Sequence, residues 1–228
     1  MNIKTGISIA NIFLLLKCKC MNDEIRILNF NSSSRVEVRM LNVVDCLRRG
    51  GVIAHATETC YGLACDAFNE EALRKFYKIK GMPEGKLVSI MVRDIAEARR
   101  CAEFGGTALR VAHEFWPGPV TLVLPRRTGL PNFLNMGASF IGLRCSDHDL
   151  AQALLFAFGG PLVTTSANFS GEKEVYSASD VKLPVDMILD SGEIPVHAPS
   201  TVLKIGTKGY EILRSGELAG DIEQFLRS

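Results

Sequence analysis

The stretch Gly50-Gly51-Val52-Ile53-Ala54-His55-Ala56-Thr57-Glu58-Thr59 contains the pattern that decides the fold. Apolar residues at helical spacing precede it, and the glycine pair is a typical helix stop; these residues are Val36, Met40, Val43, Val44 and Leu47. Residues 52–54 then form an apolar run, which predicts a buried strand, and residues 55–63 are predicted as a polar loop after it. A helix, a glycine stop, a strand and a polar loop in succession indicate an α/β protein.

The same succession recurs along the chain. We predict helices over residues 69–80, 94–105, 107–115 and 147–158. The first, second and fourth of these begin with the capping residues Asn69, Asp94 and Asp147. Strands are predicted over residues 88–92, 120–124, 140–144, 162–165, 187–190, 202–205 and 210–213. The central strands are apolar on both sides, which predicts a sheet covered by helices on both faces.

The composition is that of a soluble globular protein, with 228 residues of which 47% are apolar and 22% charged. It excludes a disordered or collagen-like chain. The net charge is +1, and without Lys4, Lys17 and Lys19 the chain from Met21 onward has 23 basic against 25 acidic residues. A chain this close to neutrality is a poor match for a wide nucleic-acid-binding surface.

The first 20 residues differ from the rest. Their apolar run, residues 7–16, is shorter than the ~20 residues needed to span a bilayer, and its flanks do not resemble a secretory signal. Met21 is a second plausible start. We therefore expect residues 1–20 to be an extension outside the fold, residues 21–228 to form a single catalytic domain, and the protein to have no membrane association.

Cysteine and histidine are too dispersed for a structural framework. The 7 cysteines form no Cys-x-x-Cys pair and the 4 histidines do not cluster with them, so we expect free thiols in a reducing cytoplasm and no protein-ligated metal. Common nucleotide and hydrolase motifs are also missing. Residues 81–87 only superficially resemble a phosphate loop, and no Gly-x-Gly-x-x-Gly or Gly-x-Ser-x-Gly is present.

Two polar stretches follow predicted strands: residues 55–63, and the segment Ser166-Ala167-Asn168-Phe169-Ser170-Gly171. Short polar side chains at strand ends line the ligand crevice in open α/β sheets. Ser, Thr and Asn also cap turns in loops without any ligand. The spacing alone leaves both interpretations open.

Several ordered segments between residues 50 and 216 resemble the family of YrdC-like threonylcarbamoyl-AMP synthases. They are Thr57-Glu58-Thr59-Cys60-Tyr61-Gly62-Leu63, Trp116-Pro117-Gly118-Pro119-Val120-Thr121-Leu122, Ile141-Gly142-Leu143-Arg144 with Asp147-His148, Thr165-Ser166-Ala167-Asn168 with Ser170-Gly171, Ser200-Thr201-Val202, and Ile212-Leu213-Arg214 with Gly216. Each segment alone is only weakly specific for the family, but their occurrence together in this order is strongly specific. The resemblance implies a twisted mixed sheet, with helices on both faces, around a deep cleft.

The resemblance also implies a reaction, in which L-threonine, bicarbonate and ATP give L-threonylcarbamoyl-AMP and pyrophosphate for threonylcarbamoyladenosine modification of tRNA. Such chemistry needs positioning, charge neutralisation and exclusion of water, and Mg²⁺ is expected with the phosphates. Arg144 is implied to hold the threonine carboxylate through its planar fork, with Thr57 and Ser200 at the amine and hydroxyl. A surface ion pair for the arginine, and turn capping for the other two, are the alternatives.

The implied nucleotide site contains Lys80, Thr121, Ser166, Asn168 and Arg214, of which Lys80, Ser166 and Asn168 are the candidate catalytic residues. Lys80 would act as a point charge on the triphosphate. Without the resemblance, a lysine at a helix C-terminus is expected only to complement the helix dipole.

The chain departs from the family pattern at several positions. Met82 stands where the pattern Lys-x-Arg-Pro has its arginine, and Met91 where a histidine is often found. Ala56, Ser146 and Ser215 replace prolines. Loss of the arginine removes charged hydrogen bonds of roughly 1.5–3 kcal/mol each. Lys78 or Lys86 can supply charge in its place, but not the bidentate geometry.

These departures leave alternatives to the synthase. The stretch 82–93 resembles YciO-type paralogues, although these match poorly at residues 116–121 and 166–168. A non-catalytic RNA-binding module and an enzyme using another carbamoyl adenylate, as in hydrogenase maturation, are further alternatives. The partners expected for the synthase are its three substrates, downstream threonylcarbamoyl transferase proteins and weakly bound tRNA.

Overall fold

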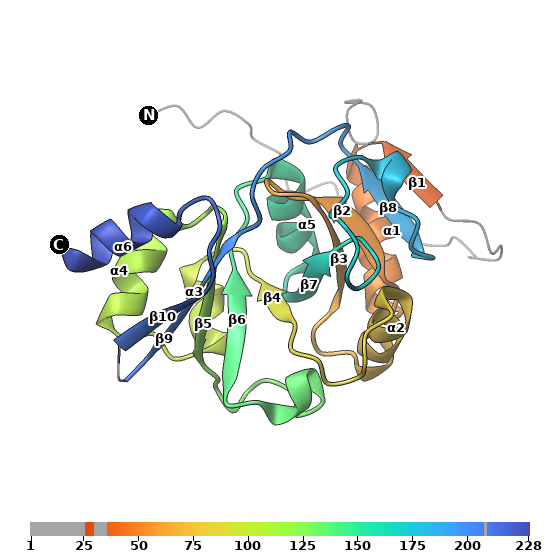
Figure 1. Cartoon of the computed structure of the whole chain (residues 1–228). Helices are drawn as coiled ribbons and strands as arrows, with labels where there is room; N and C mark the ends of the chain where they lie inside the picture. The colour runs from red at the N-terminus through yellow and green to blue at the C-terminus, as the bar shows by residue number, and fades with distance from the viewer. Residues whose placement is uncertain (1–25, 30–35, 208) are drawn as a thin grey trace.

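The computed structural model describes residues 26–29, 36–207 and 209–228, and these contain one continuous ten-stranded sheet (Figure 1). The expectation for residues 1–20 lies outside the described residues. The strands are β1 (Arg26–Asn29), β2 (Ile53–Ala56), β3 (Tyr61–Asp66), β4 (Ser89–Met91), β5 (Val120–Pro125), β6 (Phe140–Arg144), β7 (Leu162–Ser166), β8 (Met187–Asp190), β9 (Thr201–Gly206) and β10 (Gly209–Arg214). The helices are α1 (Val36–Arg48), α2 (Glu70–Lys80), α3 (Ile95–Cys101), α4 (Gly106–Phe115), α5 (Asp149–Phe158) and α6 (Ala219–Arg227), with short 3₁₀ turns at Leu134–Gly137 and Ala178–Asp180.

The sheet is mixed, in the strand order β1-β8-β2-β3-β7-β4-β6-β5-β9-β10. The pairs β1–β8, β8–β2, β4–β6 and β5–β9 are parallel, and the remaining pairs are antiparallel. Strands from both halves of the chain are therefore neighbours in the centre. This arrangement confirms the predicted mixed α/β sheet.

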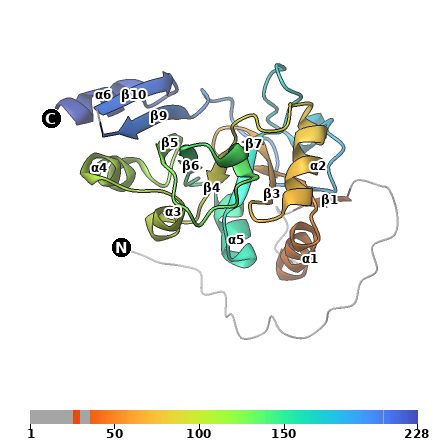
Figure 2. The same ribbon diagram turned by 90° about the horizontal axis from the view of Figure 1, so that it is seen from below.

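Alternate residues of the central strands enter two separate apolar clusters, one on each face. On β2 and β4, Ile53 and Met91 pack with α1 and α5, whereas Ala54 and Ile90 belong to the larger cluster that contains the buried face of α2. Figure 2 shows α1 and α5 together on one side of the sheet. Helices on both faces were predicted from the two-sided apolar strands, and the structure confirms them.

The local sequence explains how α2 is placed. Asn69 caps its first turn by accepting a 3.0 Å hydrogen bond from the Ala72 amide, and Gly81 ends it in the left-handed conformation with φ of 67°. This conformation favours glycine because it lacks a Cβ. Lys80 is consequently the last helical residue, held between the core and the loop after β7.

Four sequence-based element predictions were wrong in detail. Residues 55–63 are not one loop: β2 extends to Ala56 and β3 begins at Tyr61. The helix predicted to reach residue 105 ends at Cys101, because Ala102 forms a β-bridge with Arg126. The cap of α5 is His148, whose Nδ1 accepts from the Leu150 amide, and not Asp147. Helix α6 was not predicted.

Candidate active site

A cavity of about 190 Å³ lies on the sheet, with small side chains as its floor. Thr164, Ser89 and Gly142 are direct partners on the adjacent strands β7, β4 and β6, so they face the same side. A Cβ on Gly142 would lie 2.6 Å from Ser89 Oγ. The cavity is open above the sheet here because the three adjacent strands carry only small residues at this position.

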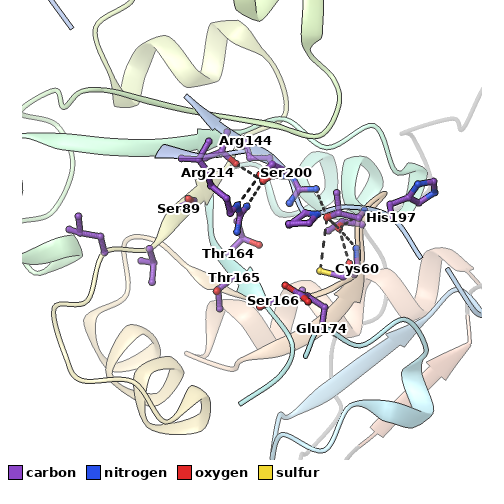
Figure 3. Close-up of a pocket in the computed structure, with 18 of the residues that line it drawn as sticks. Cys60, Ser89, Arg144, Thr164, Thr165, Ser166, Glu174, His197, Ser200 and Arg214 are labelled. Carbon is purple, nitrogen blue, oxygen red and sulfur yellow. Dashed lines mark hydrogen bonds between the residues drawn. The ribbon is translucent and has the colours of Figure 1, made fainter. Parts of the chain in front are cut away.

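Segments that are far apart in the sequence form the walls (Figure 3). The turn between β2 and β3 contributes Thr57, Thr59 and Cys60, and the loop after β7 contributes Glu174 and Tyr176. The irregular segment 191–200 crosses from β8 to β9 and brings further residues to the cavity, as Figure 1 shows. These are His197, Pro199 and Ser200.

Thr57 holds the β2–β3 turn together. Its Oγ1 donates a 2.7 Å hydrogen bond to the Cys60 carbonyl and accepts from the amides of Thr59 and Cys60, both at 3.3 Å. The hydroxyl lines the cavity and is almost completely buried. Turn capping, which the sequence left open for Thr57, is thus its structural role in this state.

Arg144 extends from the end of β6 into the cavity and is paired with a buried acid. Its Nη2 donates 2.7 Å hydrogen bonds to Glu58 Oε1 and to Thr59 Oγ1. Its buried Nε has no hydrogen-bond partner among the described residues. The ion pair is largely but not fully buried, with Arg144 13% and Glu58 14% exposed, which differs from the surface pair considered from the sequence.

Glu58 remains charged because it is well solvated by protein groups. Burial opposes its ionisation, but the Arg144 guanidinium and hydrogen bonds from Ser146 and Arg144 outweigh burial and hold its pKa below the ordinary value. Ser146 Oγ donates to Glu58 Oε2 and is itself fully buried. The sequence analysis assigned no role to Glu58. The signal that could have identified it is its position directly after a buried strand, where a carboxylate needs a charged or hydrogen-bonding partner.

Ser200, Thr121 and Arg214 form a second polar group at the opposite wall. Arg214 donates from Nε to the Ser200 carbonyl at 3.0 Å and from Nη2 to Ser200 Oγ at 2.8 Å, and Ser200 Oγ lies 3.0 Å from Thr121 Oγ1. Burial and the nearby Arg144 charge lower the pKa of Arg214. Two guanidinium groups close enough to repel one another create a preference for an anion between them.

Lys80 lies behind the cavity and is 4% exposed. Its Nζ donates to the Ser166 carbonyl at 2.5 Å and to Ser166 Oγ at 3.2 Å, and to the Asn168 carbonyl and Oδ1 at 2.6 and 2.9 Å. Burial lowers its pKa to about 8. Four oxygen acceptors nevertheless favour the ammonium form, so the charge of Lys80 is fixed directly below the loop after β7.

The structure brings most of the predicted site together. Six of the eight predicted residues line the same cavity: Thr57, Thr121, Arg144, Ser166, Ser200 and Arg214. Asn168 lines a neighbouring cavity of about 310 Å³, and Lys80 touches both Asn168 and Ser166 from below. The sequence interpretation missed Glu58, Ser89, Thr164, Glu174 and Tyr176.

Other candidate chemistry is limited in the part of the chain that the structure describes. No group of three or more His, Cys, Asp or Glu there is placed to hold a metal, and no described helix is long and apolar enough to span a membrane. Cys60, Cys65, Cys101 and Cys145 are free thiols. Burial raises the pKa of Cys60, so its thiol is a weak nucleophile although it lines the cavity.

The structure thus combines a mixed sheet, a polar cavity on its face, two converging arginines and a buried lysine. The chain belongs to the Sua5/YciO/YrdC family, described as "Telomere recombination", whose profile matches residues 45–216. It is 33% identical over 166 residues to the threonylcarbamoyl-AMP synthase of Coxiella burnetii, covering 71% of this chain and 89% of the relative. The predicted family is therefore confirmed.

Solved structures of the family share this fold. The crystal structure of P. abyssi Sua5 complexed with L-threonine has a TM-score of 0.81 at 29% identity, covering 89% of this chain and 61% of Sua5. The chain thus spans about three fifths of that protein. E. coli YciO has a TM-score of 0.75 at 25% identity, covering 86% of this chain and 98% of YciO.

Proposed function

We propose that this protein synthesises L-threonylcarbamoyl-AMP from L-threonine, bicarbonate and ATP, releasing pyrophosphate, and so acts as a nucleotidyltransferase in tRNA modification. One observation carries the proposal: Arg144 and Arg214 converge over a floor of small hydroxyl side chains, in a chain similar to a synthase and to a Sua5 that binds L-threonine. A cavity of about 190 Å³ suits a small amino acid beside a phosphate group.

The first step joins the threonine amine nitrogen to the carbon of carbon dioxide, with release of an amine proton, or to the carbon of bicarbonate, with release of water, and gives a carbamate. Arg144, which lines the cavity, holds the threonine carboxylate. Ser200 and Thr57 contact the amine and hydroxyl, and Thr121 orients the Ser200 hydroxyl through their 3.0 Å contact. Buried, positioned groups favour this step because the carbamate decomposes readily in water.

In the second step a carbamate oxygen attacks the α-phosphorus of ATP, and the bond to pyrophosphate breaks. Arg214 and Lys80 neutralise the phosphate charge, and Ser166 and Asn168 hold Lys80 in place through four contacts. Mg²⁺ would accompany the phosphates and neutralise part of their charge. Charge neutralisation of this kind supplies most of the catalysis in phosphoryl and nucleotidyl transfer.

The product is a mixed anhydride that a downstream threonylcarbamoyl transferase would consume. The free thiols agree with a reducing cytoplasm as the location, which is part of this proposal. Any tRNA binding should be weak, because the charge balance argues against a wide nucleic-acid surface.

Incubation with threonine, radiolabelled bicarbonate and ATP tests the function. We expect a labelled adenylate that requires all three substrates, with one pyrophosphate per adenylate. A protein that forms no adenylate, as expected for a paralogue with another activity, would refute the proposal. An RNA-binding module would instead keep its affinity for bulk tRNA without making adenylate, and the loss of that affinity at ~0.2 M salt excludes specific binding.

A further inference from the structure

The two arginines of the cavity differ in the charge that faces them. Arg144 forms a largely buried ion pair with Glu58, with Nη2 and Oε1 2.7 Å apart. Arg214 interacts with the carbonyl and hydroxyl of Ser200, and among the described residues no carboxylate forms an ion pair with it, although Glu174 in the cavity lining acts on its charge from a distance. The Arg144 side therefore has almost no net charge, whereas the charge of Arg214 is only partly offset.

Glu58 is held in place by more than Arg144. The second oxygen of Glu58 accepts a hydrogen bond from Ser146 Oγ. Ser146 lies just before α5 and is held there by two further hydrogen bonds: its Oγ accepts from the His148 amide at 3.3 Å, and its carbonyl accepts from Gln152 Nε2 at 2.6 Å. Ser146 stands at a position where the family pattern has a proline, which has no hydroxyl. The carboxylate is thus built into the protein behind Arg144, outside the cavity lining.

Charge is what distinguishes the two ligands that must share this cavity. Guanidinium groups bind carboxylate and phosphate with the same bidentate geometry, so the shape of an arginine does not separate them. An amino acid brings one negative charge in its carboxylate and a triphosphate brings about four. A neutral Arg144–Glu58 pair still offers N–H donors to a carboxylate, but it attracts a polyanion much less strongly than a bare arginine does.

We propose that Glu58 is a specificity-determining residue that cancels the charge of Arg144 and so keeps phosphate groups out of the amino-acid subsite. The inference rests on the proposed function for the identity of the amino acid. Its mechanism depends only on the charges of these side chains: Glu58 excludes polyphosphate from Arg144 and leaves Arg214 and Lys80 as the phosphate ligands.

Tripolyphosphate without nucleoside is the probe, and titration calorimetry gives the number of sites. We expect one tripolyphosphate per wild-type chain and two in Glu58→Gln. The second site should be at least tenfold tighter than any binding there in the wild type, since removing a unit charge at ~6 Å and an effective dielectric of ~20 changes affinity roughly a hundredfold before screening. Arg144→Gln added to Glu58→Gln should remove the second site.

Three controls separate charge from other effects. Ser146→Ala keeps the Glu58 charge and should bind one tripolyphosphate, although its carboxylate is less restrained. Glu174→Gln removes another acid that lines the same cavity but pairs with no arginine among the described residues, and it should also bind one. Melting curves confirm that each variant is folded.

Competition with threonine completes the test. In Glu58→Gln, tripolyphosphate should compete with threonine, whereas in the wild type the two should bind together. One site in Glu58→Gln, a second site already in the wild type, or a second site that survives removal of Arg144 would each overturn the inference. A wild-type protein that binds no threonine would refute the proposed function instead, and the tripolyphosphate counts would still decide the role of Glu58.

Discussion

Asn168→Ala tests whether the loop after β7 serves the reaction or only the fold. Asn168 is almost fully buried and makes two side-chain hydrogen bonds: Oδ1 accepts from Lys80 Nζ at 2.9 Å, and Nδ2 donates to the Glu172 carbonyl at 2.6 Å. A hydrogen bond to a charged group contributes ~1.5–3 kcal/mol and a neutral one ~0.5–1.5 kcal/mol. Because Lys80 keeps three other acceptors, we expect the variant to lose about 2–4 kcal/mol of stability, or roughly 5–15 °C in Tm.

The catalytic effect is predicted separately from the stability effect. With one anchor lost, the Lys80 ammonium samples positions away from the phosphates, and adenylate formation should fall at least ~10-fold, which corresponds to about 1.4 kcal/mol in the barrier. Pyrophosphate release well below Tm measures it, with separate values of kcat and of KM for ATP. Asn69→Ala is the matched control, because it removes a helix cap worth ~1 kcal/mol without touching Lys80. Asn168→Ala with wild-type kcat and ATP KM, at any Tm, would refute a role for the contact in the reaction.

Three further predictions address pH, selectivity and space. Because burial lowers the pKa of Lys80 to about 8, ATP affinity should fall as the pH rises through 8, with the slope expected for the loss of one proton. Lys80→Arg should show no such change. The free energy of unfolding should instead increase as the pH rises above 8, since the unfolded chain binds the lysine proton more tightly than the folded protein does. Threonine should be preferred over valine at least ~100-fold in kcat/KM, because Thr57 and Ser200 would be left with unpaired polar groups beside valine, and equal pyrophosphate release with both would contradict this. Gly142→Val should fold but lose threonine binding by calorimetry, because its side chain would fill the cavity floor beside Ser89, and unchanged binding would place the ligand elsewhere.

The sequence predicted elements well where local signals agreed. Asn69 caps α2 and the helix ends at Lys80, as predicted, and β6 and β8 have the predicted limits. It failed at β3, which begins inside residues 55–63, a stretch predicted as a polar loop. A Cβ at Gly62 would lie 3.2 Å from the Thr165 carbonyl oxygen, so the close approach of the neighbouring strand favours a small residue there. Such a constraint comes from tertiary structure and leaves no local pattern.

The site shows the same division. Residue spacing left the polar stretches open between capping and binding, and only the family resemblance assigned roles. No spacing rule relates Lys80 to Ser166, or Glu58 to Arg144, because these pairs are 86 residues apart in sequence and meet only through the strand order. Ser200 shows that one residue can contact both predicted subsites, as it bonds Arg214 and Thr121. Sequence analysis had placed it with threonine alone.

Met82 stands where the family pattern has an arginine. The structure favours the explanation that another residue supplies the phosphate-binding charge over the explanation that this charge is simply absent. Met82 is half-buried and packs against the main apolar cluster, and its amide donates to the Tyr77 carbonyl at the end of α2. Lys86, four residues on, is exposed, and its Nζ lies 3.5 Å from Ser170 Oγ in the loop after β7, close enough for its charge to act on Lys80.

A charged side chain at position 82 would have to leave the apolar cluster or be buried without a partner. We therefore expect Met82→Arg to lower Tm and to leave the KM for ATP no better than in the wild type. Lys86→Ala should raise the KM for ATP roughly tenfold, the effect of losing about 1.4 kcal/mol of binding, whereas Lys78→Ala, on the exposed side of α2, should not. Melting temperature and pyrophosphate release of the three variants decide between the accounts. A stable Met82→Arg with a lower KM or a higher turnover would show that the arginine is simply absent and that the lysine does not replace it.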